Sequence, residues 1–338
     1  FAMFRHSSGV SGHLFSCRKT LEMTPHVSGT ILEIDDLHTH FRTRDGVVRA
    51  IEGLSLTVQA GEVLGIVGES GCGKSTVARL VAGLLTPTSG TILFKGKLLQ
   101  TCSQKELLKI QMVFQDPLSS LNPRMRLAQQ LTEAITVHGI VSRSEQETYL
   151  RGIFGDCGID PILANRYPHQ VSGGQRQRFG IARALAMQPD LILCDEPVAA
   201  LDVSIQAQIV NLFAKLRRDR GLAYLFISHD LNVVRHLCDE TIVMYLGRVV
   251  ERGPSTAIMA NPRHRYTDDL RMAAPRVSAT KRNFSPVHGE IPSPLSPPSG
   301  CAYHTRCRFV DTRCKTDMPP ISTTPTGAFT CHNPISIT

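Results

Sequence analysis

The sequence contains no tryptophan, and aromatic residues make up only 6% of its 338 residues. It also lacks any apolar run near the ~18 residues that a membrane-spanning helix requires. We therefore expect a chain that does not cross a bilayer. No sustained apolar segment follows the first residues, so no secretory signal is expected. Residues 1–30 are predicted to form a poorly ordered leader before a large α/β domain.

A concentrated basic stripe is missing too, although the net charge is +8. Positive residues such as Arg18, Arg42 and Arg49 are scattered, and aromatic residues do not alternate with them. Such a charge permits contact with anionic lipid headgroups or nucleic acid without selecting either. We interpret it as a solvated surface and predict no nucleic-acid partner.

A glycine-rich motif, G-x-x-x-x-G-K-S, is the strongest signal in the first hundred residues. It follows the apolar run 62–67, which predicts a buried parallel strand. It precedes a predicted helix whose apolar face carries Val77, Leu80, Val81 and Leu84. Backbone N–H groups and the helix N-terminus in such a turn face phosphate groups. We expect Lys74 to reach the β- and γ-phosphates and Ser75 to ligate Mg²⁺. The motif comprises Gly68, Glu69, Ser70, Gly71, Cys72, Gly73, Lys74, Ser75 and Thr76.

Two adjacent carboxylates, Asp195 and Glu196, end a second short apolar run at 191–194. Buried without partners they would be costly, but beside a bound metal ion they gain partners. Asp195 is expected to position Mg²⁺, and Glu196 to orient and deprotonate an attacking water. The alternative to a catalytic role is that the two residues only form an acidic end to a strand at the surface.

The order of further motifs resembles the ABC-type ATPase subunits over roughly residues 31–262. Gln115 matches the Q-loop of that family, Asp202 its D-loop and His229 its switch histidine. The signature motif is matched by Ser172, Gly173, Gly174 and Gln175. The resemblance implies that two subunits sandwich two ATP molecules, with the signature of one subunit on the γ-phosphate held by the other.

The same resemblance assigns roles to single residues. It implies that Gln115 contacts Mg²⁺ and water, that His229 contacts the γ-phosphate, and that an aromatic residue stacks on adenine. Phe41 is the candidate for stacking, with a core or exposed-loop phenylalanine as the alternatives. The expected fold is an α/β P-loop ATPase with an antiparallel β layer, a helical subdomain at about 116–172 and a small Cys-containing extension at 263–338. Within the subdomain, helices are expected over 127–138 and 144–154, where helix-forming residues are frequent.

The extension resembles the C-terminal region of bacterial dipeptide/oligopeptide importer ATPases, which related nickel importers share. Segments 264–267 and 297–307 carry this likeness, together with 114–123 in the Q-loop. It implies an ATPase that powers peptide uptake from the cytoplasmic face of the cell membrane. The implied partners are two transmembrane permease subunits, a second identical or paralogous ATPase subunit, and an extracytoplasmic peptide-binding protein. A nickel or other small-solute importer and a non-transport ABC ATPase are the alternatives.

Four cysteines crowd the extension with the spacing C-x5-C-x6-C-x16-C. The resemblance implies an iron–sulfur cluster in some relatives, and we favour a [4Fe-4S] site. A zinc site, the alternative, usually shows tighter C-x2-4-C pairs, and a disulfide is unfavourable in a reducing cytosol. The remaining alternative is that the cysteines merely pack a small, Pro-rich lobe. Because few residues in 283–338 can form a hydrophobic core, the metal or cluster site is expected to hold this segment together. The four residues are Cys301, Cys307, Cys314 and Cys331.

Overall fold

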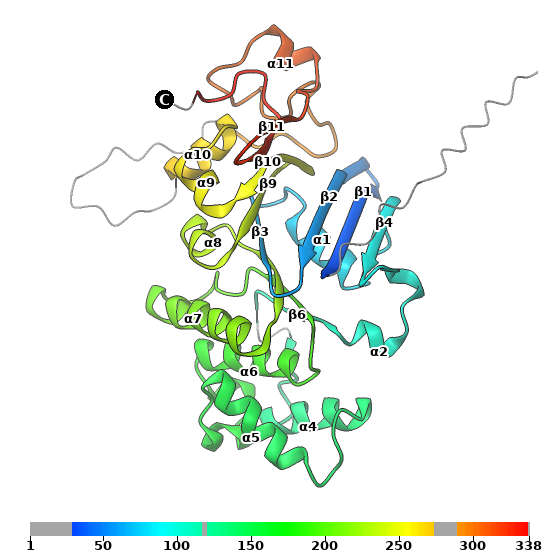
Figure 1. Cartoon of the computed structure of the whole chain (residues 1–338), viewed down its shortest axis with the longest axis vertical. Helices are drawn as coiled ribbons and strands as arrows, with labels where there is room; N and C mark the ends of the chain where they lie inside the picture. The colour runs from blue at the N-terminus through cyan, green and yellow to red at the C-terminus, as the bar shows by residue number, and fades with distance from the viewer. Residues whose placement is uncertain (1–28, 117–119, 274–288, 337–338) are drawn as a thin grey trace, which may run out of the picture.

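The computed structural model describes residues 29–116, 120–273 and 289–336. Nearly all of the predicted leader lies outside the described residues, as do 117–119 of the Q-loop segment and the first prolines of the extension. Figure 1 shows a long molecule with a central sheet, a helical arm at one end and the extension at the other.

The central sheet has eight strands in the order β11-β12-β10-β9-β3-β8-β7-β6. Strands β6, β7, β8, β3 and β9 pair in parallel, whereas β10, β12 and β11 add in antiparallel fashion. Every residue of β3, β7 and β8 is buried, which explains why these strands are apolar up to Asp195, the last residue of β7. The bounds are β3 Val63–Val67, β6 Ile110–Val113, β7 Leu191–Asp195, β8 Ala223–Ile227, β9 Glu240–Tyr245, β10 Arg248–Pro254, β11 Ser322–Thr324 and β12 Gly327–Phe329.

A separate antiparallel sheet has the order β2-β1-β4-β5. Its strands are β1 Thr30–Thr43, β2 Gly46–Gln59, β4 Ser89–Phe94 and β5 Lys97–Leu98. Its buried face packs with helix α1, Lys74–Val81, in one hydrophobic cluster that also contains part of the central sheet. The predicted antiparallel layer is therefore present. The prediction that Leu84 continues the apolar face of the helix was wrong, because α1 ends at Val81 and Leu84 is 61% exposed.

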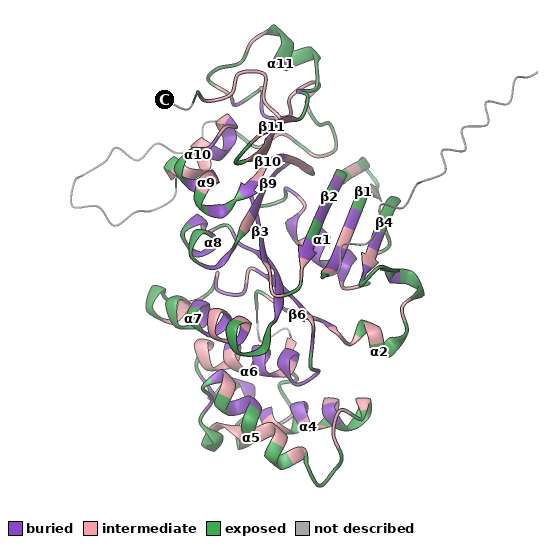
Figure 2. Ribbon diagram, in the orientation of Figure 1, coloured by how far each residue is buried: buried purple, intermediate pink, exposed green. Residues whose placement is uncertain are grey.

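The helical arm contains α4, Leu127–His138, and α5, Gln146–Cys157. Their apolar sides pack against α6, Gly173–Leu185, and Figure 2 shows exposed residues on the opposite sides. Both α4 and α5 end at a glycine with positive φ, the favoured helix C-cap. The helices predicted over 127–138 and 144–154 are thus confirmed within a few residues. Further helices are α2 Gln104–Leu107, α7 Val203–Arg220, α8 Leu231–Leu237, α9 Ser255–Ala260, α10 Arg265–Ala273 and α11 Thr312–Thr316.

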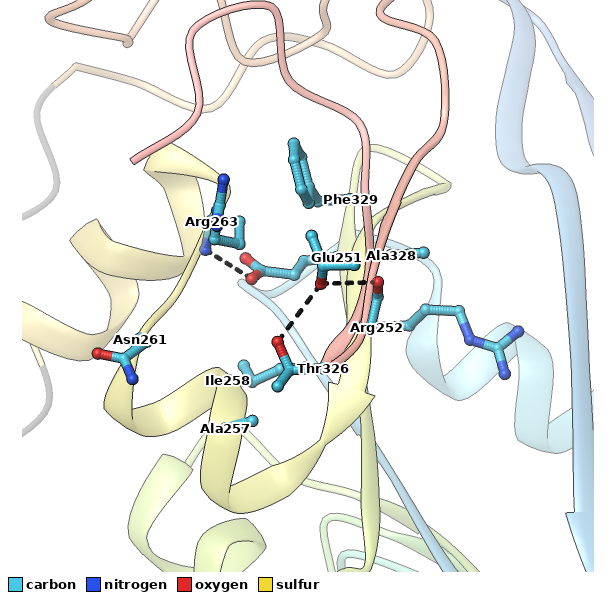
Figure 3. A pocket seen from close by; sticks show the side chains of 11 residues that line it. Glu251, Arg252, Ala257, Ile258, Asn261, Arg263, Thr326, Ala328 and Phe329 are labelled. Carbon is cyan, nitrogen blue, oxygen red and sulfur yellow. Dashed lines mark hydrogen bonds between the residues drawn. The ribbon is translucent and has the colours of Figure 1, made fainter. Parts of the chain in front are cut away.

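The extension joins the central sheet and does not stand apart from it. Strand β12 pairs with β10 through Glu251↔Phe329 and Arg252↔Ala328. The buried Glu251 carboxylate accepts hydrogen bonds from the backbone N–H of Arg263 at 2.6 Å and of His264 at 2.9 Å. Figure 3 shows this carboxylate beneath Phe329 in the pocket where the extension meets the core. Among the described residues no helix is long and apolar enough to cross a membrane.

Candidate nucleotide-binding site

The phosphate loop connects β3 to α1, as its sequence predicts. Gly68 has φ 154° and Gly73 has φ 106°, values that disfavour any other residue. A Cβ on Gly68 would lie 2.3 Å from the carbonyl oxygen of Met244, and one on Gly73 would lie 2.4 Å from that of Ala50. These two glycines are therefore fixed by packing of the loop against neighbouring backbone.

Lys74 lies within the loop, where its side chain is almost fully buried. Its Nζ donates to the carbonyl oxygens of Gly68 at 2.7 Å and of Glu69 at 2.9 Å. The neighbouring Cys72 is also buried, and burial raises the pKa of its thiol. A buried thiol of raised pKa is a poor nucleophile, and Cys72 packs within the loop.

Ser75 and Asp195 meet at the carboxyl edge of the sheet. The Ser75 hydroxyl donates to the Asp195 Oδ1 at 2.7 Å, although the two residues are 120 positions apart in sequence. Burial raises the pKa of Asp195, while the hydrogen bond from Ser75 opposes that shift. Two hard oxygen ligands adjacent to a phosphate loop fit the ligand preference of Mg²⁺.

Glu196 lies at the centre of a second group of polar side chains. Its Oε2 accepts a hydrogen bond from the Gln115 Nε2 at 3.3 Å and lies 3.2 Å from the His229 Nδ1. Gln115 follows β6, Glu196 follows β7 and His229 follows β8, so the three come from adjacent parallel strands. Glu196 has φ 48°, a left-handed conformation that is uncommon outside glycine and recurs at functional sites.

The signature residues form the start of α6. The Ser172 hydroxyl accepts from the Gln175 N–H at 3.3 Å, and the Gln175 side chain accepts from the Ser172 N–H at 2.9 Å, which is a capping box. Gly174 lies against α7, because a Cβ there would be 2.5 Å from a methyl carbon of Ile205. Ser172 is exposed and helps to line a recess of about 350 Å³ with Gly174.

Two predicted contributors are not joined to these groups by any described hydrogen bond. Asp202 precedes α7 at its N-cap and makes no side-chain capping bond there. Phe41 lies near the end of β1, opposite Val48 of β2, and is half-buried. Its adenine-stacking role stays a prediction. Gly71, Gly173, Ser70 and Thr76 occupy the turn or helix starts that their motifs predict.

The four cysteines of the extension are free thiols that interact electrostatically. Burial raises the pKa of Cys301 to about 11, and the other three thiols add to that shift. Within the described residues, three potential metal ligands lie within 4.8 Å of one another at His38, His40 and Glu52. The four cysteines, all in the described part of the chain, do not form such a group. The group at Glu52 is an ion-pair network, since Arg248 lies 3.3 Å from the Glu52 carboxylate.

Sequence reasoning missed the residues of the extension that contact the phosphate loop. Arg306 forms a two-point ion pair with Glu69, and the Tyr266 hydroxyl accepts a hydrogen bond from the Glu69 N–H at 2.8 Å. These residues are 197 and 237 positions from Glu69. A single sequence carries no signal for such a long-range pairing.

Two family models match the chain. One, described as ABC transporter, matches residues 51–199, and the other, described as oligopeptide/dipeptide transporter, C-terminal region, matches residues 250–314. The first covers the phosphate loop, the signature and the two carboxylates. The second covers most of β10, the buried Arg306 and three of the four cysteines of the extension.

Curated relatives match nearly the full length. The chain is 47% identical to a probable peptide ABC transporter ATP-binding protein, y4tS, of Sinorhizobium fredii, with 90% of both chains covered. It is 45% identical to the oligopeptide transport ATP-binding protein AppF of Bacillus subtilis, covering 92% of this chain and 99% of that protein. It is 46% identical to OppF of Escherichia coli, covering 86% and 92%.

Solved structures agree on the fold. CbiO1 of Clostridium perfringens, part of an ABC transporter complex, has a TM-score of 0.61 at 30% identity over 69% of this chain and 91% of its own. The cassette MJ0796, solved as a dimer bound to ADP and phosphate, has a TM-score of 0.60 at 27% identity, over 67% and 99%. The fold and site define an ABC-type ATPase. The chain belongs to the family of ATP-binding subunits of peptide ABC transporters.

Proposed function

We propose that this chain hydrolyses ATP to power the uptake of dipeptides or oligopeptides through a membrane ABC importer. The supporting observation is that one chain combines the converging groups around Ser75–Asp195 and Glu196 with a C-terminal region typical of oligopeptide and dipeptide transporters. The relatives that it resembles carry peptide transport in their names. The proposed location is the cytoplasmic face of the membrane, bound to two permease subunits and served by an extracytoplasmic binding protein.

Each residue of the site has a defined task in this proposal. Glu196 accepts the proton of the attacking water, because its carboxylate is held between Gln115 and His229. Lys74 and the loop N–H groups stabilise charge on the β- and γ-phosphates. Gln115 orients the water, and His229 contacts the γ-phosphate. Phe41 is proposed to stack on adenine.

Mg²⁺ fits the same site. The hydroxyl of Ser75 and the carboxylate of Asp195 are hard oxygen donors at 2.7 Å from each other. The family resemblance adds Gln115 as a further ligand. The bound ion would neutralise charge on the triphosphate. The raised pKa of Asp195 fits the need for a cationic partner at this partly buried carboxylate.

The signature requires a second subunit in this proposal. Ser172, Gly173, Gly174 and Gln175 present a helix N-terminus to solvent beside an open recess, which suits an anion brought by another chain. The matching cassette MJ0796 is solved as a dimer. Asp202, which precedes the neighbouring helix α7, is proposed to lie at the same interface between the two subunits.

The decisive experiment is reconstitution of the chain with its permeases and binding protein in liposomes. Glu196→Gln is expected to lower kcat by about 10²–10⁴-fold and to retain ATP binding, because a general base contributes that much. Peptide uptake should stop with it. Glu147→Gln, on the exposed face of α5, is the matched control and should retain full activity. Full turnover in Glu196→Gln would refute the assignment, and uptake of nickel in place of peptides would refute the substrate class.

For the four cysteines we propose a [4Fe-4S] cluster and not zinc. Zinc with Zn–S bonds of ~2.3 Å holds its sulfurs only about 3.8 Å apart. No three of the four thiols, all within the described residues, lie within 4.8 Å of one another. A [4Fe-4S] cluster binds each thiolate to a different iron and so does not need three sulfurs that close together. Deprotonating buried thiols of raised pKa needs a strongly cationic partner. The cluster would tie together a segment with few apolar residues.

Metal analysis tests this assignment directly. Protein purified without oxygen is expected to contain about four iron atoms per chain and to absorb visible light, and Cys314→Ser should lose iron. Stoichiometric zinc in a colourless sample would overturn the cluster.

A further inference from the structure

The extension contacts the nucleotide site through one buried arginine. The Arg306 Nη1 lies 2.6 Å from the Glu69 Oε2, and its Nη2 lies 2.9 Å from the Glu69 Oε1. The Arg306 side chain is 3% exposed and the Glu69 side chain 20% exposed. This is the two-point geometry in which an arginine binds a carboxylate most strongly. It joins the extension to the second residue of the phosphate loop.

Two tyrosines contact the arginine, and a third packs against both of them. The guanidinium lies 5.8 Å from the ring centres of both Tyr245 and Tyr303, and the Tyr245 hydroxyl accepts a hydrogen bond from it at 3.4 Å. The rings of Tyr245, Tyr266 and Tyr303 pack with centroids 4.6 to 5.2 Å apart. Such packing limits the rotamers of Arg306, so its position follows that of the whole extension.

Glu69 is bound on three sides. Its carboxylate accepts from Arg306, its N–H donates to the Tyr266 hydroxyl at 2.8 Å, and its carbonyl accepts from the Lys74 Nζ at 2.9 Å. The arginine therefore fixes the loop residue whose carbonyl is a partner of the phosphate-binding lysine. It also neutralises a carboxylate that would otherwise repel a triphosphate in the same loop.

We propose that Arg306 is a positioning residue for ATP binding, which holds the phosphate loop and cancels the charge of Glu69. Through it the extension, including the adjacent Cys307, sets the affinity of the loop for ATP. This inference depends on the proposed role of Lys74 and its loop.

If Arg306 acts by cancelling the charge of Glu69, substitutions of the two residues should change the KM for ATP unequally. A purely structural contact would give equal effects. Arg306→Gln should raise the KM for ATP by about tenfold or more, because it leaves the Glu69 carboxylate unpaired next to the triphosphate. The kcat should change much less. Glu69→Gln should raise KM less, and the double variant Arg306→Gln/Glu69→Gln should return to within about threefold of the wild type.

Two further variants complete the test on the full-length chain. Arg306→Lys keeps the charge and loses the second contact, so its KM should fall between wild type and Arg306→Gln; it also carries the test if Arg306→Gln does not fold. Arg313→Gln removes an exposed arginine of the same extension that pairs with Asp311, and it should leave KM unchanged.

A KM within twofold of wild type in both Arg306 variants, or a double variant no better than Arg306→Gln alone, would overturn the proposal. Lys74→Ala separates this failure from failure of the proposed function. If Lys74→Ala binds ATP normally, the assignment of the phosphate loop is wrong. If Lys74→Ala loses ATP and the Arg306 variants do not, only the inference about Arg306 fails.

Discussion

The nucleotide-binding core and the C-terminal extension reach their structures by different means. In the core, short parallel strands are buried on both faces, and Gln115, Glu196 and His229 each follow the end of a parallel strand. In the extension beyond helix α10, two three-residue strands and a five-residue helix make up the regular structure. Individual contacts hold the extension, among them Arg306 to Glu69 and Glu251 to the backbone of Arg263 and His264. The core is fixed by continuous packing, whereas the extension adds a few buried polar anchors to the packing of its tyrosines against the core.

The largest effect on stability is expected from breaking the tight packing of the core. Gly68→Ala should lower the free energy of unfolding by about 2–5 kcal/mol, since its Cβ would meet the Met244 carbonyl oxygen and its φ is unfavourable for alanine. Urea unfolding followed by circular dichroism measures this loss.

The matched control is Gly71→Ala in the same loop. Gly71 has φ 81° but no atom within 4 Å of an added Cβ, so only backbone strain of about 1–2 kcal/mol is expected. Equal losses in the two variants would show that close packing does not distinguish Gly68, and the comparison would fail.

A smaller, pH-dependent effect is expected from an anchor of the extension. His264 is fully buried, and burial lowers its pKa to about 3. The unfolded chain takes up a proton near pH 6.5 and the folded chain does not, so stability falls as pH drops below 6.5. The slope is about 1.4 kcal/mol per pH unit, or about 2 kcal/mol between pH 6.5 and 5.

Urea unfolding at several pH values tests this slope. His264→Gln should remove it, whatever that variant does to stability at pH 7. His236→Gln, at an exposed position on α8, should keep the slope of the wild type. The same slope in all three proteins would mean that His264 titrates normally and that the extension is not packed as tightly as the core.

The sequence was sufficient to predict most of the core. The phosphate loop, the strand before Asp195 and the two arm helices follow from local patterns, because each depends on neighbouring residues. The prediction failed at Leu84, where the apolar spacing continued past the end of the helix. The spacing of apolar residues does not indicate the residue at which a helix ends and the backbone turns away from the core.

The contacts of the extension could not be predicted in the same way. The pairing of β12 with β10 and of Arg306 with Glu69 joins segments separated by 76 to 237 positions. Neither a three-residue strand nor a lone arginine has a periodicity to recognise. The extension was recognised by family resemblance and its four cysteines, and its connection to the phosphate loop emerged only from the packing.

Strand β11 has a consequence for how this protein behaves in a crowded cell. It is the outermost strand at one end of the central sheet, it is three residues long, and Pro320 and Pro325 flank it. Proline offers no N–H for pairing, so a foreign strand finds little ladder to extend. The extension thereby protects this sheet edge against aggregation, and a chain cut before Ser322 would leave the longer β10 open to unwanted strand exchange.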